Sequence, residues 1–374
     1  MTTGTVDAGK SAEGSTGMEA VDTDTTETTV GDRSDQVVLD TLSLGFAWPT
    51  VDPFIVAVHH VDHYPAGNLE LGPASAEGRR APDGDPSAPG WSMYHGSIVP
   101  GFPQHPHRGF ETVTFVRMGA VDHSDSLGAT ARYGVGDVQW LTAGSGIQHA
   151  EMFPLRDPDG PNPLDLFQIW LNLPGADKMV EPYFTMLWRE ELPTTVVKDE
   201  AGHSTGVTVV AGAFEDIRPL PAPPDSWASK DDAEVAIWQF LAEASAQWIL
   251  PPTAQPGTVR TLYVFEGSVE VGGRTLEAPI GAVLRSDAPV VVSAGDVGAA
   301  ALVLQGRPIG EPVAMGGPFV MNTRAEVEQA NLDFHRTGFG GWPWAAPDPV
   351  HPTSTPRFAR HPAGRTEHPE SDER

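Results

Sequence analysis

The chain has 374 residues, of which 40% are apolar and 20% charged, as expected for a globular protein of two or three domains. Its net charge of −27 disfavours direct binding to nucleic acid, and the absence of cysteine excludes disulfides, thiolate metal ligands and a cysteine nucleophile. No apolar run approaches the ~18 residues of a membrane helix. Since the N-terminal segment also lacks a secretory signal, the sequence predicts a cytoplasmic protein without membrane contact.

Both ends of the chain are predicted to be disordered. Residues 1–36 are rich in Thr, Asp, Glu and Gly and contain no aromatic residue, so they bury too little apolar surface to offset the entropy of ordering. Residues 345–374 carry repeated prolines among charged side chains, which is typical of a mobile tail. Between these tails we expect two domains, residues 37–180 and residues 181–344.

The region between the tails has the pattern of an all-β protein. Short runs of β-branched and aromatic residues are separated by Gly, Pro, Asp and Ser. Residues 111–119 and 259–267 repeat weakly, because both read as a strand followed by a glycine turn. Two related barrels in one chain explain this repeat. The clearest of these runs are residues 54–58, 111–116, 166–171, 207–210, 261–265 and 299–304.

One helix is expected near the end of the chain, over residues 322–338. Thr323 and Glu326 have the spacing of a capping box, and Gly338 is a typical helix stop. Val327, Ala330 and Phe334 form an apolar stripe at helical spacing. We therefore predict a short C-terminal helix that packs on a barrel and has a structural role.

Four side chains in two motifs predict a metal site. His105 and His107 stand two residues apart, and side chains alternate along a strand, so both point to one face. By the same rule Glu111 is expected on that face. A second pair, His149 and Glu151, follows a glycine turn. Three imidazoles with a carboxylate suit iron, manganese, nickel, copper or zinc, and are too rich in nitrogen for magnesium or calcium.

Several longer strings resemble the pirin family. The resemblance spans roughly residues 52–344 and leaves out both tails and the loop before residue 90. It implies an all-β fold of two cupin barrels (double-stranded β-helix or jelly-roll) packed together, with the short C-terminal helix. The strings that carry it are PQHPHRGFETVT, HSDSLG, GDVQWLTAGSGIQHAEM, LFQIWLNLP and GEPVAMGGPFVMNT.

This resemblance implies one iron ion in the N-terminal barrel, bound by His105, His107, His149 and Glu151. The general cupin pattern would instead place the carboxylate ligand at Glu111, so the choice between the two carboxylates stays open. We assign Glu151 as the ligand and Glu111 as a pocket residue with a catalytic role that orients a ligand or bound water.

The second barrel is expected to hold no similar metal. At the offset that aligns the two repeats, His105 and His107 correspond to Thr253 and Gln255, and Glu111 corresponds to Val259. None of these three side chains supplies an imidazole or a carboxylate. We therefore expect a structural barrel or an interaction surface there.

Three functions are compatible with these residues. The first is a quercetin 2,3-dioxygenase-like enzyme that uses Fe(II), an aromatic substrate and O₂, with Glu151 as a base if it leaves the metal. The alternative is a metal-dependent, redox-sensing regulatory protein that acts through protein partners, as the resemblance to eukaryotic members implies. Isomerase or other small-molecule chemistry on a different metal is the third.

Overall fold

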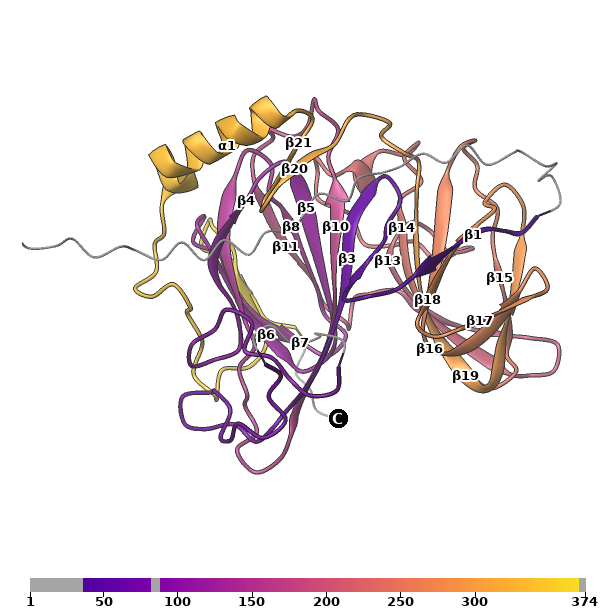
Figure 1. Ribbon diagram of the computed structural model, residues 1–374, viewed down its shortest axis with the longest axis horizontal. Coiled ribbons are helices and arrows are strands. Elements are labelled where there is room, and N and C mark those ends of the chain that lie inside the picture. The colour runs from indigo at the N-terminus through magenta and orange to yellow at the C-terminus, as the bar shows by residue number, and fades with distance from the viewer. Residues whose placement is uncertain (1–35, 82–87, 370–374) are drawn as a thin grey trace, which may run out of the picture. The chain divides into compact units, whose positions relative to one another are not determined.

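The computed structural model describes residues 36–81 and 88–369 (Figure 1). Nearly all regular structure in these ranges is antiparallel β-sheet, which confirms the all-β prediction. The predicted N-terminal disordered segment lies outside the described residues, apart from Gln36. No helix in the described ranges has the length and apolar character needed to cross a membrane.

The first barrel is built from two six-stranded sheets whose inner faces enclose the predicted metal site. One sheet has the order β11 (Tyr183–Leu187), β8 (Val138–Thr142), β5 (Phe110–Met118), β10 (Asn162–Asn172), β3 (Phe54–Tyr64) and β2 (Ala47–Trp48). The other has the order β23 (Thr366–Glu367), β22 (Phe358–Arg360), β7 (Thr130–Gly134), β6 (Ala120–Asp125), β9 (Ile147–Met152) and β4 (Gly101–His107).

The second barrel is a single nine-stranded sheet. Its long strands β16 and β19 pair over most of their length, and register shifts near Phe265 and Ser268 interrupt the pairing and bend the sheet. In spatial order the strands are β1 (Val38–Ser43), β18 (Ile280–Leu284), β16 (Val259–Val271), β19 (Val290–Gly306), β14 (Ala236–Ala242), β13 (Ser204–Ala211) and β12 (Thr194–Lys198), with β15 (Gln247–Leu250) on β19 and β17 (Arg274–Glu277) on β16.

The two barrels exchange chain segments, so the predicted domain borders do not follow the fold. Strand β1 precedes the first barrel in sequence but pairs with β18 of the second. After the second barrel the chain returns to the first as the hairpin β20 (Ala314–Gly316) and β21 (Phe319–Met321), helix α1 (Arg324–Thr337) and the turn η2 (Gly338–Gly340). Figure 1 shows α1 beside the first barrel and β1 among the strands of the second. A short turn, η1 (Trp227–Ser229), lies in the segment between β13 and β14.

The expectation of a disordered C-terminal tail is wrong for residues 345–369. Strand β22 pairs with β7, and β23 pairs with β22. The buried guanidinium of Arg132 donates hydrogen bonds to the carbonyl oxygens of His351 and Pro352, at 2.8 and 2.7 Å. Prolines do not prevent this order, because an extended edge segment can pair through its remaining N–H groups while its carbonyls satisfy a buried cation.

Helix α1 confirms the predicted capping box. The Thr323 side chain accepts from the Glu326 backbone N–H, the Glu326 carboxylate accepts from the Thr323 backbone N–H, and Gly338 ends the helix in the left-handed region at φ 55°. The helix packs on β20 and β21, next to the first barrel. Within the predicted stripe, Ala330 is fully buried.

Candidate metal centre

Three imidazoles meet inside the first barrel. Strands β4 and β9 are antiparallel neighbours, and their register sets His105 directly opposite His149. The ring centroids lie 4.4 Å apart for this pair, 4.8 Å for His105 and His107, and 4.9 Å for His107 and His149. One nitrogen from each ring lies within 4.8 Å of the others. The three histidines, called the triad below, therefore converge as the sequence predicts, in an arrangement that can hold a metal ion.

The triad is in the protonation state that a metal needs. Burial lowers the pKa of His105 to about 4 and the pKa values of His107 and His149 well below their usual range. All three rings are therefore neutral near pH 7, and each offers a lone pair.

The hydrogen bonds of the triad select which nitrogen is free. His105 Nδ1 lies 2.9 Å from the carbonyl oxygen of Pro103, and His107 Nδ1 lies 3.3 Å from that of Pro318. A carbonyl oxygen only accepts, so Nδ1 carries the proton in both rings and Nε2 carries the lone pair. Both nitrogens of His149 are buried without a hydrogen-bond partner among the described residues. An unpaired buried polar atom is costly, and a metal ion would satisfy it. The donor set fits a metal.

Glu151 lies beside the triad. Its Oε2 is 3.7 Å from His149 Nε2 and accepts a hydrogen bond from the Gln168 side-chain amide at 3.2 Å. The Thr114 hydroxyl lies 3.0 Å from Oε1. Burial raises the pKa of the Glu151 carboxyl, and His123, Thr114 and Gln168 oppose this rise by stabilising the charged form. Glu151 is not part of the cluster within 4.8 Å, so its role as fourth ligand stays a prediction.

Glu111 faces away from the triad, contrary to the expectation that it lines the metal pocket. Strand β4 ends at His107 and β5 begins at Phe110, with Gly109 between them at φ 86°. The alternation therefore does not continue across this break. The Phe110 ring lies 5.1 Å from His107, whereas the next side chain, Glu111, points to the other face of β5.

On that other face Glu111 is buried in hydrogen bonds. Its carboxylate accepts from Trp140 Nε1 at 3.2 Å, from the Thr142 hydroxyl at 2.7 Å and from the Ser226 hydroxyl at 2.5 Å. Ser226 belongs to the segment between β13 and β14 of the second barrel. Burial raises the pKa of Glu111 to about 7, against these hydrogen bonds.

The segment that returns from the second barrel closes the loop between β4 and β5, a feature that sequence reasoning missed. The Pro318 carbonyl of this segment accepts from His107. The buried Lys178 ammonium joins the loop to the segment, because it donates to the carbonyl oxygens of Gly109 and Val320, at 2.8 and 3.0 Å. Arg108 forms an ion pair with Asp333 of α1 at 2.9 Å. Contacts to backbone carbonyls leave no pattern in the sequence, because every residue has a carbonyl group. Of these contacts, only the ion pair between Arg108 and an acidic side chain could be predicted from residue types.

The other histidines lie outside the triad, and His123 is adjacent to it. His123, in the motif HSDSLG, lies 3.2 Å from Asp125 through Nε2, and its ring centroid is 5.5 Å from that of His149. His59 contacts Asp165 at 2.8 Å on the face towards the second barrel, whereas His63 is exposed. His95 is exposed beside Phe102, with ring centroids 5.6 Å apart.

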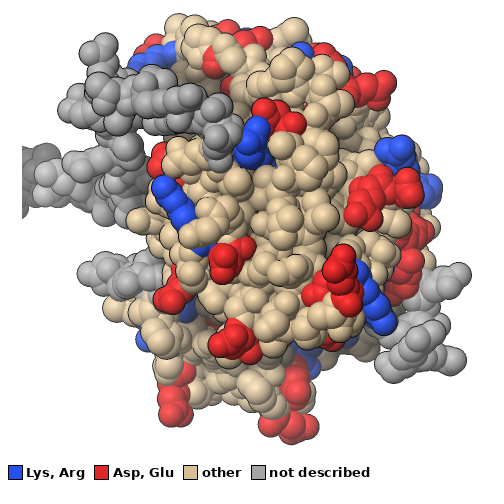
Figure 2. Space-filling model, turned by 90° about the vertical axis from the view of Figure 1, so that its right-hand side faces the viewer, with Lys and Arg blue, Asp and Glu red and all other residues tan. Residues whose placement is uncertain are grey.

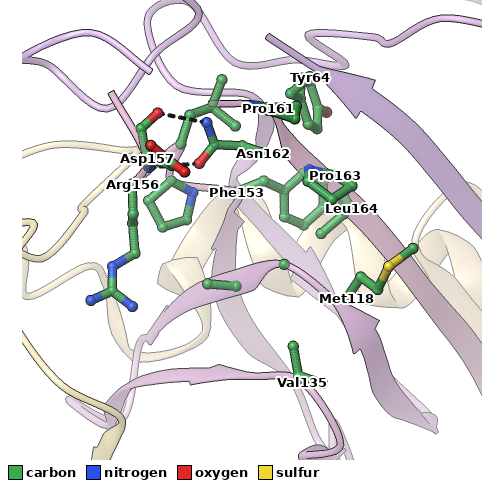
Figure 3. A pocket seen from close by; sticks show the side chains of 14 residues that line it. Tyr64, Met118, Val135, Phe153, Arg156, Asp157, Pro161, Asn162, Pro163 and Leu164 are labelled. Atoms are coloured by element: carbon green, nitrogen blue, oxygen red, sulfur yellow. Dashed lines mark hydrogen bonds between the residues drawn. The ribbon is translucent and has the colours of Figure 1, made fainter. Parts of the chain in front are cut away.

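A surface pocket of about 390 Å³ contains none of the triad residues. Figure 3 shows it between the turn at Met118, the loop that carries Phe153 and Arg156, and the side chain of Val135. Its lining is mainly apolar and holds no cluster of metal-binding groups. The face of the molecule in Figure 2 shows scattered acidic side chains with few basic ones, and no basic patch for a phosphate backbone.

Comparisons with known proteins agree with this architecture. Residues 83–171 match the Pirin family, and residues 237–340 match the Pirin C-terminal cupin domain. A Pseudomonas aeruginosa protein named "Putative quercetin 2,3-dioxygenase" is 37% identical over 64% of this chain and 79% of its own length. Human pirin is 35% identical over 66% of this chain and 80% of its own. A crystal structure of quercetin 2,3-dioxygenase from Acinetobacter baumannii superimposes with a TM-score of 0.63 and 25% identity, covering 82% of this chain and 96% of that one.

Proposed function

The chain belongs to the pirin family, and from this premise we propose that it is an iron-dependent dioxygenase acting on a flavonol-like or other enolic aromatic substrate in the cytoplasm. The observation that carries the proposal is the triad: three neutral imidazoles whose lone pairs converge inside a barrel. The relatives named for quercetin 2,3-dioxygenase support the choice of substrate class.

His105, His107 and His149 would hold the iron, and Glu151 would be its fourth ligand. Bound iron with open positions would bring a chelating enol and O₂ together and would supply the electron density for their reaction. Glu151 lies beside the triad and would accept the proton of the enol if it left the metal, with the Gln168 amide as its hydrogen-bond donor. Phe110 and Trp170, 5.5 Å or less from the His107 ring, exclude water from that side.

Oxygen uptake and carbon monoxide release with quercetin test this function. We expect turnover by iron-loaded native protein and by His63→Ala, because His63 is exposed and away from the triad. The variant His107→Ala should lose both activities. Equal turnover by His107→Ala and native protein would refute the proposal, and so would a native protein that carries zinc alone.

A hydrogen bond from the triad to the segment that leads into α1 supports a second candidate function. This candidate is a metal-dependent regulator that acts through protein partners. His107 bonds the carbonyl of Pro318, and that segment continues into α1, where Leu332 is 63% exposed. A change in the metal's oxidation state that shifts His107 would move the Pro318 carbonyl, and through it the exposed surface of α1. Identical partner profiles in pull-downs under oxidising and reducing conditions would contradict this role.

A further inference from the structure

His60 points into the first barrel from β3, on the opposite face to His59. The His59 ring stacks on Phe167 on the face towards the second barrel. The His60 ring instead contacts Phe102 and Phe46, with centroids 5.9 and 5.3 Å away. In the β3–β10 register His60 is opposite Leu166, and the preceding inward side chain, Val58, is opposite Gln168, which bonds Glu151. His60 therefore lies on the same wall as Gln168, one pair further along.

A chain of hydrogen bonds orients the His60 ring. Arg80 donates to one oxygen of the fully buried Asp62 at 2.7 Å, and the Tyr94 hydroxyl donates to the other at 2.6 Å. His60 Nδ1 lies 2.9 Å from the same hydroxyl. A phenol has a single proton, and here it is given to Asp62. The Tyr94 oxygen must therefore accept from His60, so Nδ1 carries the hydrogen and Nε2 keeps a lone pair.

That lone pair has no hydrogen-bond partner among the described residues. His60 is 5% exposed. Burial lowers the pKa of His60 to about 3, so the ring is neutral near pH 7. The site thus presents an uncharged acceptor whose tautomer is fixed.

Phe102 connects this acceptor to the triad. Its half-buried ring lies 5.9 Å from the His60 ring and 6.3 Å from the His105 ring. Tyr94, which orients His60, lies 4.9 Å from Phe102 and has φ 54°. A non-glycine residue in the left-handed region is strained, and such strain is concentrated at functional sites. A planar ring lying on Phe102 would reach from the triad to His60.

We propose that His60 is a substrate-binding residue whose Nε2 accepts a hydrogen bond from a peripheral hydroxyl of a planar polyhydroxylated aromatic substrate. The substrate lies against Phe102, with its chelating oxygens towards the triad and the peripheral hydroxyl towards His60. This inference rests on the proposed function for its substrate class. It assigns the end of the substrate remote from the metal, so it can be tested by binding alone.

Quercetin binding to zinc-loaded protein tests the inference, because zinc allows binding without redox turnover. His60→Leu removes the acceptor and should raise the dissociation constant about three- to tenfold, the value of one hydrogen bond. The matched control, His63→Leu, changes the same residue type on the same strand at an exposed position and should bind like native protein. His60→Gln keeps an acceptor and should recover part of the affinity.

Quercetin analogues that each lack one hydroxyl separate a direct contact from a structural effect. One analogue should bind native protein and His60→Leu equally, because it lacks the hydroxyl that His60 accepts from. If His60→Leu does not fold, Tyr94→Phe, which removes the oxygen that sets the His60 tautomer, serves in the same comparison. An equal loss for every analogue, or no loss for any, would overturn the inference.

The two proposals can fail separately. If native protein turns quercetin over while His60→Leu binds it as tightly as native protein does, the role of His60 is refuted and the dioxygenase stands. If native protein binds quercetin in a His60-dependent way without oxygen uptake, the dioxygenase is refuted and the binding role stands. If native zinc-loaded protein binds none of these compounds, the role of His60 is refuted.

Discussion

The two barrels differ most in what fills them. The interior of the second barrel is an apolar core that includes Trp238, Phe240, Trp248, Leu262 and Val292, each at most 2% exposed. The first barrel instead holds the triad between aromatic rings and the hydrogen-bonded side chains of Glu151 and Gln168. Two β-barrels in one chain thus enclose either an apolar core or a cluster of buried imidazoles. The difference depends on a few inward positions, because each strand sends every second side chain inwards.

The positions that correspond to the triad in the repeat show how the second barrel differs. Thr253 and Gln255 lie in the loop before β16. The Thr253 hydroxyl donates to the carbonyl of Ser286 at 3.0 Å, and the Gln255 carbonyl accepts from the Thr258 hydroxyl at 2.9 Å. These residues fasten a loop to the barrel. The first barrel, in contrast, has a regular strand at this point and directs its side chains to the interior.

The largest expected effect would test whether the two interiors are independent. Phe240→Ala removes a fully buried ring from the second barrel and should lower the free energy of unfolding by about 3–5 kcal/mol. The metal content per folded chain should not change, because Phe240 does not contact the triad. Chemical denaturation and metal analysis of the folded fraction measure both quantities. A loss of metal in that fraction would show that the barrels are coupled.

Removing one triad imidazole tests whether metal binding belongs to the first barrel alone. His149→Ala should weaken metal binding more than about 100-fold, since loss of a ligand exceeds the loss of a residue that orients one. Titration calorimetry with Fe(II) or Zn(II) measures the affinity. The matched change in the second barrel, Thr253→Ala, should leave it unchanged. Similar affinities in His149→Ala and native protein would show that the triad is not the site.

Glu111 gives the next largest effect and concerns the boundary between the barrels. Its folded pKa of about 7 lies above the ordinary value of 4.5, so its contribution to stability is fully present below pH 4.5 and is lost as pH rises through 7. Glu111→Gln cannot ionise but can still hydrogen-bond Trp140, Thr142 and Ser226. The variant should therefore gain about 3 kcal/mol relative to native protein between pH 4.5 and pH 8.

Urea denaturation of both proteins across this pH range measures the difference. The neighbouring Asp225 raises the pKa of Glu111 further, so Asp225→Asn should reduce the pH dependence without abolishing it. A constant difference between Glu111→Gln and native protein at all pH values would contradict the prediction.

The smallest effect is expected at the ion pair between α1 and the loop that follows His107. Asp333→Asn removes the carboxylate that pairs with Arg108 near the surface, so we expect only a small loss in unfolding free energy, below that of the other variants. Metal affinity should change little, because Arg108 keeps its bond to the Ser145 carbonyl at 2.7 Å. Differential scanning fluorimetry and metal titration test this. A large fall in metal affinity would show that α1 positions the triad.

Local patterns in the sequence were sufficient for the features that lie within one strand or one helix. His105 and His107 share a face because they lie on a single uninterrupted strand, and Thr323 with Glu326 caps a helix because both act within one turn. The all-β class followed from the spacing of short apolar runs in the same way. Each of these conclusions uses a period that the backbone itself imposes.

Tertiary structure decided the features that depend on contacts distant in sequence. Glu111 turned out to face the second barrel because Gly109 interrupts the strand, and no residue pattern marks which side a new strand takes. The bond from His107 to the carbonyl of Pro318, the order of the C-terminal strands and the placement of β1 in the second barrel join segments far apart along the chain. Their formation depends on the surface that another segment offers, which local periodicity does not encode.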